Sequence, residues 1–246
     1  MSNAANISAQ TTQPQHSTGS VAMIRTLGGV ATISGVLLAL VYQATFAIIE
    51  KNKQEKVREA VFAVIPDATQ QVRFVLQQES NTLRPADGGE APDGVALFGG
   101  YDDQGRFVGV AIEASGQGYG DIIRVIYGYA PGESQLTGLK VLESKETPGL
   151  GDRISGEEFR ENFQGMDVAL NADKSGLVHP IEFVKHGNKT EPWQVDGISG
   201  ATISSKAVTK MVRESTQEVL PVVHANLSVL KRNGPKPGSG KEGDNR

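Results

Sequence analysis

A run of small residues, Asp196-Gly-Ile-Ser-Gly-Ala-Thr202, ends in a threonine directly before a helical pattern. Small side chains leave the Thr202 hydroxyl and the neighbouring backbone N–H groups open to a ligand. Because the first N–H groups of a helix lack intrahelical partners and carry partial positive charge, such a turn can hold a phosphate. Lys206 could add a countercharge. The same residues also fit an ordinary glycine turn before a serine-capped helix, and their spacing alone does not separate the two interpretations.

A second loop pattern lies about fifty residues upstream, at Glu146-Thr-Pro-Gly-Leu-Gly-Asp152. Pro148 fixes the backbone, and the glycines at 149 and 151 allow a ligand to approach the main chain closely. Leu150 lies between the glycines and offers an apolar surface. The run is also consistent with a plain proline-glycine turn at the end of the preceding strand.

The composition excludes several kinds of chemistry. The chain has no cysteine, which excludes iron–sulfur clusters, thiolate zinc sites, disulfides and thiol catalysis. The four histidines show no metal-ligand spacing, so we expect no metal site. Arg25 is the only charged residue among the first 49, which leaves 23 of the 24 basic residues against 28 acidic ones, a net charge of −5, for residues 50–246. A mildly acidic domain has no basic surface for nucleic acid, and redox chemistry in it needs an imported cofactor.

The two runs together resemble the FMN-binding domain family. Asp196 to Thr202 is similar to the flavinylation signature of that family, and Glu146 to Gly151 is similar to its upstream loop. In the family, a flavin transferase moves FMN from FAD onto the final threonine through a phosphoester bond. The resemblance covers roughly residues 27–220. The resemblance is greatest to the G subunits of Rnf electron-transport complexes, and the aspartate at position 152 also favours this group. The C subunits of sodium-translocating NADH:quinone reductases come second.

The resemblance implies a role for each residue of the downstream run. Thr202 would carry the FMN covalently. Four residues would surround its phosphate: Ser199, Gly200, Ala201 and Lys206. Asp196 would assist the flavin transferase, although an Asx turn is its ordinary role. No catalytic residue and no metal ligand are implied.

The resemblance also implies contacts to the isoalloxazine ring. These would come from four residues of the upstream loop: Glu146, Thr147, Leu150 and Gly151. Leu150 would offer its apolar surface to the ring, and Glu146 and Thr147 would form hydrogen bonds to the ring edge. The glycine-rich segment 116–120 is expected to lie over the flavin face. Trp193 would either stack on the ring or fill the core, since a lone aromatic side chain is usually a packing residue.

The elements that must position these loops begin with a membrane anchor. Residues 1–22 are rich in polar uncharged side chains, which predicts a disordered tail. From Leu27 to Ile49 the chain runs 23 residues without a charge, enough for about 34 Å of helix against a hydrocarbon core of roughly 30 Å. We therefore predict a transmembrane helix over residues 23–49. A cleaved signal peptide is the alternative, but it would have a shorter apolar run and a more basic start.

The remaining segments predict an α+β domain behind this anchor. Residues 50–92 are expected to form a stalk helix, ending before Pro66, and a connecting region. The FMN-binding domain is expected over residues 93–232, and a disordered tail over 233–246. Strand patterns occupy five segments: 95–98, 106–113, 122–129, 136–142 and 181–184. The first four strands suggest an antiparallel sheet with helices segregated toward one face.

Helical patterns lie after the fourth strand and at the end of the domain. A short one covers residues 156–163, and a long one begins with Ser204 or Ser205 as the N-cap. Pro221 is expected to end or kink the long helix, because proline lacks a backbone N–H. A second helix is then predicted over residues 222–230.

The positively charged residues and the family resemblance favour opposite orientations of the anchor. Lys51, Lys53, Lys56 and Arg58 follow the helix, whereas Arg25 alone precedes it. This distribution favours a cytoplasmic C-terminal domain. In the family that the chain resembles, flavin transfer takes place outside the cytoplasm. We give the resemblance more weight and expect a single-pass protein of the bacterial inner membrane with its C-terminal domain on the periplasmic side.

The function implied by the resemblance is electron transfer by a membrane-anchored protein with covalent FMN. In Rnf complexes the overall reaction is electron exchange between ferredoxin and NAD, coupled to ion movement across the membrane. The implied partners are other membrane subunits of an Rnf-type complex, the flavin transferase during maturation, and membrane lipid, with no nucleic acid. Three alternatives stay open: a C-type subunit of the sodium-translocating reductase, a stand-alone membrane FMN-binding sensor or electron donor, and a flavin-free scaffold subunit.

Overall fold

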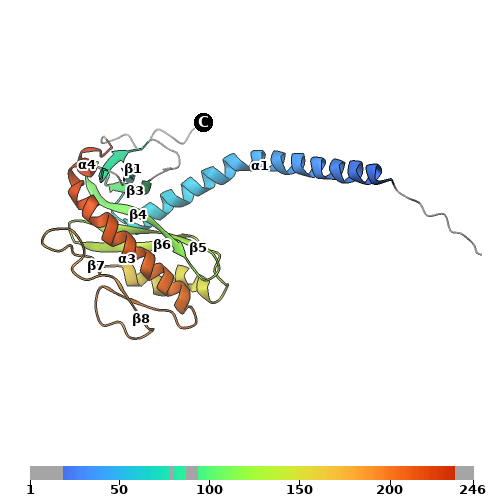
Figure 1. Ribbon diagram of the computed structural model, residues 1–246. Helices are drawn as coiled ribbons and strands as arrows, with labels where there is room; N and C mark the ends of the chain where they lie inside the picture. The colour runs from blue at the N-terminus through green and yellow to red at the C-terminus, as the bar shows by residue number, and fades with distance from the viewer. Residues whose placement is uncertain (1–18, 78–79, 87–93, 236–246) are drawn as a thin grey trace, which may run out of the picture. The chain divides into compact units, whose positions relative to one another are not determined.

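The computed structural model describes residues 19–77, 80–86 and 94–235 (Figure 1). Seven antiparallel strands form one sheet in the order β2-β1-β3-β4-β5-β6-β7. Their bounds are β1 Gln70–Gln77, β2 Thr82–Pro85, β3 Gly94–Tyr101, β4 Phe107–Gln117, β5 Ile122–Ala130, β6 Gln135–Glu143 and β7 Met166–Asp167. A separate parallel pair consists of β8 Glu182–Val184 and β9 Gln194–Asp196. The predicted α+β class with an antiparallel sheet is confirmed.

The helices lie before the sheet, after β6 and at the end of the described chain. Their bounds are α1 Ser20–Val64, η1 Gly151–Ser155, α2 Glu157–Arg160, η2 Glu161–Phe163, α3 Thr202–Ala225 and α4 Leu227–Arg232. The short helical segment predicted over residues 156–163 corresponds to α2 and η2. α1 ends at Val64, so the stalk helix ends before Pro66, as predicted.

The N-terminal part of α1 has the properties of a membrane anchor. Every side chain from Val21 to Ile49 is exposed. Among the described residues, α1 is the one helix that is long and apolar enough to cross a membrane. The chain divides into two compact units within α1, residues 1–52 and 53–246. Since apolar side chains on this scale are unfavourable in water, the exposed stretch fits a lipid environment.

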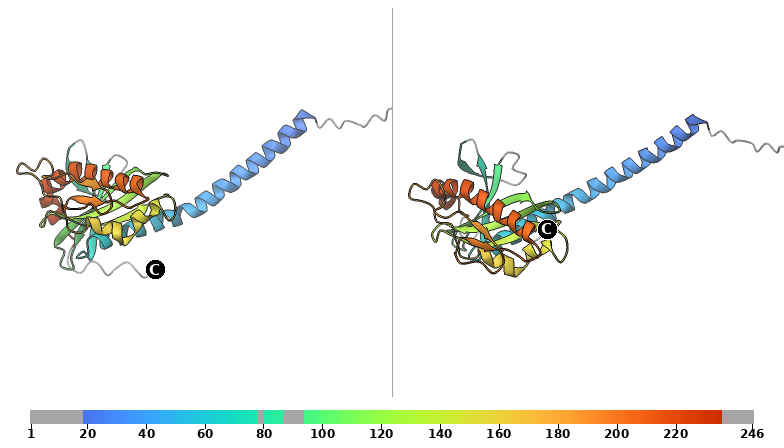
Figure 2. Two further views of the ribbon diagram at one scale, coloured as in Figure 1. Left: turned by 90° about the horizontal axis from the view of Figure 1, so that it is seen from below. Right: turned by 60° about the horizontal axis from the view of Figure 1, so that its bottom comes forward.

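Both faces of the sheet are covered (Figure 2). Side chains alternate along each strand, so Val110 and Ile112 of β4 point to one face and Ala111 to the other. The first face packs against α3 in the main core. The second packs against the last turns of α1, where Val61 and Val64 are buried. The prediction that the helices lie toward one face is therefore wrong, because the stalk helix continues into the domain and covers the second face.

The segment between the stalk helix and residue 93 contains two strands that the sequence analysis missed. β1 pairs with β3 along its whole length and with β2 on its other side. Val72, Phe74 and Leu76 alternate along β1, and this period of two is the signal that could have revealed the strand. Glutamines at both ends of the strand weaken the signal, since β1 is only half-buried over much of its length.

The helix that follows the threonine run is longer than predicted at both ends. α3 begins at Thr202, with Ala201 at the N-cap position, so Ser204 and Ser205 lie inside the first turn rather than at the cap. It also continues through Pro221 to Ala225, whereas the sequence analysis predicted an end or a kink there. Val219 and Leu220 are buried in the core beside Pro221. We attribute the continuation to this packing, which offsets the missing backbone hydrogen bond.

Candidate functional site

The structure brings the two loops together, although they are far apart in the sequence. The Arg153 guanidinium donates a hydrogen bond from Nη1 to the Ser199 carbonyl oxygen at 3.0 Å. Leu150 Cδ2 lies 3.8 Å from the position that a Cβ on Gly200 would occupy. The Ser204 hydroxyl donates a hydrogen bond to Glu146 Oε2. The upstream loop therefore lies against the turn that leads into α3.

Thr202 is the first residue of α3, and its side chain is exposed. Among the described residues, the Thr202 hydroxyl has no hydrogen-bond partner. Gly200 precedes it with φ +85°, a conformation that favours glycine and turns the chain into the helix. Because the first N–H groups of an α-helix lack intrahelical acceptors, a phosphate on Thr202 would lie at the positive end of the helix dipole. The residues present therefore fit a phosphoester at this position.

Ser205 fixes the turn that presents Thr202. Its hydroxyl is fully buried, accepts a hydrogen bond from the Ile198 N–H at 3.1 Å and donates one to the Ala201 carbonyl oxygen at 2.9 Å. The Ala201 N–H in turn donates to the Ile198 carbonyl oxygen at 3.0 Å. Ser205 thus holds the residues before the helix from within the first turn, not from the predicted cap position.

The upstream loop is a tight turn with an exposed leucine. The Thr147 carbonyl oxygen accepts hydrogen bonds from the Leu150 N–H at 3.1 Å and the Asp152 N–H at 3.4 Å. Gly149 has φ +76°, and Gly151 is buried. The Thr147 and Leu150 side chains are exposed, and Leu150 retains 51% of its surface. An exposed apolar side chain beside Thr202 offers a planar ring a surface to lie against.

Glu146 differs in orientation from the other residues of its loop, because its side chain is buried and directed into the protein. Its Oε1 accepts a hydrogen bond from the Gly120 N–H at 3.0 Å, and its Oε2 accepts the one from Ser204. Both oxygens therefore bond within the chain. The hydrogen bond to a ring edge that we expected from Glu146 is not prepared by this geometry.

Lys206 and Trp193 have partners of their own in the structure. The Lys206 ammonium lies 5.3 Å from the centre of the Phe183 ring in β8, a cation–π arrangement. Lys206 is also one helical turn beyond Thr202, on the same face of α3. The Trp193 ring stacks on His179, with ring centres 3.9 Å apart. One face of Trp193 is therefore occupied, and no contact that we observe among the described residues joins it to the two loops.

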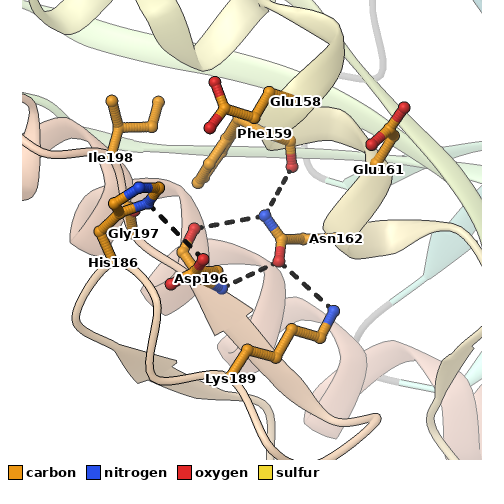
Figure 3. A pocket seen from close by; sticks show the side chains of 9 residues that line it. All are labelled: Glu158, Phe159, Glu161, Asn162, His186, Lys189, Asp196, Gly197 and Ile198. Carbon is orange, nitrogen blue, oxygen red and sulfur yellow. Dashed lines mark hydrogen bonds and ion pairs between the residues drawn. The ribbon is translucent and has the colours of Figure 1, made fainter.

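Asp196 lies at the edge of a small cavity of about 230 Å³ (Figure 3). Its carboxylate accepts the Gly187 N–H through both oxygens, at 2.8 and 3.1 Å, which joins the end of β9 to the loop after β8, nine residues earlier in the chain. The cavity is lined by Glu158, Phe159, Glu161, Asn162, His186, Lys189, Asp196, Gly197 and Ile198. Burial lowers the pKa of the Lys189 ammonium, and the nearby Asp196 carboxylate opposes that shift.

Asn162 holds the start of the threonine run in place, and the sequence analysis did not find it. This buried side chain accepts the Asp196 N–H at 2.9 Å and donates to the Asp196 carbonyl oxygen at 3.2 Å (Figure 3). It also donates to the Phe159 carbonyl oxygen at 3.0 Å and is contacted by Lys189. A lone asparagine 34 residues from Asp196 gives no local signal of this pairing.

The change Asn162→Ala is expected to destabilise the domain by about 1–3 kcal/mol, because it leaves buried main-chain groups without partners. Chemical denaturation monitored by circular dichroism measures this loss. Asn188→Ala is the matched control, since Asn188 is exposed in the neighbouring loop and its change should stay within about 0.5 kcal/mol. Equal stability of the two variants would contradict the role of Asn162.

Sequence comparison finds related proteins over most of the chain. Residues 118–217 match the FMN-binding domain family. The chain is 31% identical to the G subunit of an ion-translocating oxidoreductase complex of Methanosarcina acetivorans, over 80% of this chain and 93% of the relative. It is 28% identical to a protein of the same name from Shewanella piezotolerans, over 77% and 84%. The G subunit of a proton-translocating ferredoxin:NAD(+) oxidoreductase complex of Clostridium ljungdahlii is 25% identical, over 76% and 84%.

Two solved structures share the fold. Shewanella oneidensis NqrC aligns with a TM-score of 0.58 at 17% identity, over 74% of this chain and all of that one. The C subunit of the Na(+)-translocating NADH-quinone reductase from Parabacteroides distasonis aligns with a TM-score of 0.57 at 21% identity, over 73% and 96%. At these identities the likeness concerns the fold alone.

Proposed function

Because the chain belongs to the family of G subunits of ion-translocating oxidoreductase complexes, we propose that it is a membrane-anchored electron-transfer protein that carries FMN on Thr202. One observation carries the covalent assignment: Thr202 is exposed at the N-terminal end of α3 and lies beside the upstream loop. The flavin, once attached, would accept and pass electrons between other redox centres of the complex. The polypeptide supplies the position and the surroundings of the ring.

The residues around Thr202 suit the two parts of FMN differently. The N-terminal end of α3 would stabilise the phosphate through its unpaired N–H groups and the helix dipole. Leu150 and Ile203, both more than half exposed, flank this point with apolar surface. The ring would cover them and so remove apolar surface from water. Tyr119, 68% exposed in the turn between β4 and β5, is a further aromatic side chain of the predicted glycine-rich loop.

Attachment of the flavin requires FAD and a flavin transferase as partners. The Thr202 oxygen would form a bond to the FMN phosphorus of FAD, and the bond between that phosphorus and the bridging oxygen would break. AMP would leave with the proton equivalent of the threonine hydroxyl. No change in oxidation state takes place in this transfer. An exposed hydroxyl without a protein partner is accessible to such an enzyme, as Thr202 is.

The proposed function is tested on the full chain co-expressed with a flavin transferase. A denaturing gel under ultraviolet light should show a fluorescent band, because covalent flavin survives denaturation. When the chain is purified from its native host, further membrane subunits should copurify with it. A nonfluorescent band would favour a flavin-free scaffold, and a fluorescent protein that purifies alone would favour a stand-alone sensor or electron donor.

We also propose that the domain after α1 lies outside the cytoplasm, where flavin transfer would take place. The chain has no cysteine, so a single introduced cysteine reports its own location. Glu133→Cys, at the exposed turn between β5 and β6, should react with a membrane-impermeant maleimide on intact spheroplasts. Ser17→Cys, before the anchor, should react only after lysis. The reverse labelling pattern would place the domain in the cytoplasm, as the count of lysines and arginines favours.

A further inference from the structure

The Glu146 carboxylate joins three segments that come from different parts of the chain. Its own loop carries Leu150, the turn between β4 and β5 supplies the Gly120 N–H, and the first turn of α3 supplies the Ser204 hydroxyl. We propose that Glu146 is a positioning residue that fixes the upstream loop relative to Thr202 before any flavin is attached. We call the two hydrogen bonds of the Glu146 carboxylate the clamp. The effect of the clamp on the flavin rests on the proposed function, but the clamp itself does not.

The position of Glu146 in the fold shows why its carboxylate can act as a clamp. The side chain is 6% exposed, so water does not compete for its oxygens. Each oxygen accepts from a different segment, one from Gly120 at 3.0 Å and the other from Ser204. Ser204 lies two residues beyond Thr202 in the same helical turn. A shift of the loop relative to the helix would therefore break a hydrogen bond to a buried carboxylate.

Glycines leave the space that the carboxylate fills. A Cβ on Gly118 would lie 2.4 Å from Glu146 Oε1, and a Cβ on Gly151 would lie 2.5 Å from Glu146 Oε2. Both distances are shorter than side-chain contacts allow, so neither position accepts another residue without a shift. Gly118 lies in the turn between β4 and β5 and Gly151 in the upstream loop, which are two of the three segments that Glu146 connects. The close fit restricts the carboxylate to the orientation in which both hydrogen bonds form.

Lys145, the residue before Glu146, contacts the turn between β4 and β5 at the protein surface. The Lys145 ammonium contacts Asp121 Oδ2 at 2.7 Å, and the Asp121 carbonyl oxygen accepts the Gly118 N–H at 2.9 Å. Lys145 is exposed, so screening by water weakens this ion pair. The hydrogen bond from Gly120 to the buried Glu146 carboxylate therefore contributes more to holding this turn. We infer that the surface around Leu150 is already in place for a planar ring in the flavin-free protein.

Amide hydrogen exchange on the flavin-free full chain tests the clamp directly. The Gly120 N–H should exchange about tenfold faster in Glu146→Ala than in the unmodified chain, because its acceptor is gone. Glu146→Gln keeps a carbonyl oxygen for Gly120 and should retain most of the protection. Thr216→Val removes a buried hydroxyl elsewhere in α3, whose partner is the Arg213 carbonyl oxygen, and should leave Gly120 unchanged. Unchanged Gly120 exchange in Glu146→Ala would overturn the proposal.

A second variant keeps the proposal testable if Glu146→Ala does not fold. Ser204→Ala removes the link to α3 and leaves the acceptor of Gly120 in place. With covalent flavin present, Ser204→Ala should alter the visible circular dichroism and raise the flavin fluorescence about twofold or more, because the ring is held less firmly. Thr216→Val should change neither signal. Flavin signals in Ser204→Ala identical to those of the unmodified chain would contradict the positioning role.

The two proposals fail in different ways. An unmodified chain without covalent flavin would contradict the proposed function, while the Gly120 exchange would still test the clamp. A folded Glu146→Gln variant that keeps Gly120 protected but takes up no flavin would assign Glu146 to the attachment reaction and overturn the positioning role. Normal attachment in Glu146→Gln supports that role.

Discussion

Thr202→Ala is expected to abolish covalent flavin completely, because it removes the only atom to which the proposed phosphoester can be attached. Thr202→Ser keeps a hydroxyl at the same position and should retain some labelling. The measurement is flavin fluorescence of the denatured band after co-expression with the transferase, normalised to protein. Since Thr202 is exposed, the free energy of unfolding of the alanine variant should lie within about 0.5 kcal/mol of that of the unmodified chain.

Ser199→Ala is the matched control for this experiment. Ser199 is a second exposed hydroxyl in the same run, three residues before Thr202. Its side chain is not the proposed acceptor, and its carbonyl oxygen, which Arg153 contacts, is unaffected by the change. Flavin should therefore still become attached in Ser199→Ala, although Ser199 is expected beside the phosphate, because the acceptor oxygen of Thr202 is still present. A fluorescent Thr202→Ala band, or loss of fluorescence in Ser199→Ala alone, would contradict the assignment of Thr202.

The second large effect concerns two truncations of α1. Removal of residues 1–52 should release a folded domain into the soluble fraction, because the domain's contacts begin after this point. Removal of residues 1–66 should leave a protein that aggregates. The longer deletion also removes four buried residues of the second sheet face: Ala60, Val61, Val64 and Ile65. At about 1.5–3 kcal/mol for each large aliphatic side chain, the loss is comparable to the whole stability of a domain.

Size-exclusion chromatography and chemical denaturation compare the two truncations. The shorter one should elute as a compact species with a cooperative unfolding transition. The longer one exposes Phe98, Ala111 and Ile126 on the uncovered face, and should elute as aggregates or unfold at much lower denaturant concentration. Equal stability of both truncations would show that the last turns of α1 do not belong to the domain core.

The local parts of this fold could be predicted from the sequence. Apolar runs bounded by turn residues indicated β3, β4, β5 and β6 within a few residues, and the uncharged stretch indicated the anchor helix. β1 was missed because its alternation at Val72, Phe74 and Leu76 is set among glutamines and an arginine. The extent of α3 was missed because Ser204 and Ser205 have the residue type of caps, whereas tertiary packing buries them.

The candidate site could likewise be predicted from the sequence only in part. The two loop patterns identified the segments that meet, since each is a short run with unusual glycine content. Their spacing did not reveal that Glu146 points inward or that Asn162 binds the main chain of Asp196. Those contacts join residues that are 26 and 34 positions apart. Only the folded chain brings them together, because hydrogen bonds between distant segments follow from topology and not from local propensity.

Membership of the G-subunit family narrows the alternatives for function. The likeness to the C subunits of sodium-translocating reductases is one of fold, at 17% and 21% identity. The relatives that share sequence over most of their length are named as G subunits of ion-translocating complexes. A C-type subunit is therefore the weaker alternative. The stand-alone sensor and the flavin-free scaffold differ from our proposal in partners and in cofactor, and the copurification and gel experiments separate them.

Peptide mass spectrometry of the mature protein shows directly whether Thr202 carries FMN. After proteolysis, the peptide that contains Thr202 should be heavier by the mass of FMN less one water, and fragmentation should place the added mass on Thr202. The unmodified form of this peptide should be the major one only when the transferase is absent. Flavin on another residue, or a Thr202 peptide without added mass in a protein purified from its active complex, would contradict the assignment of FMN to Thr202.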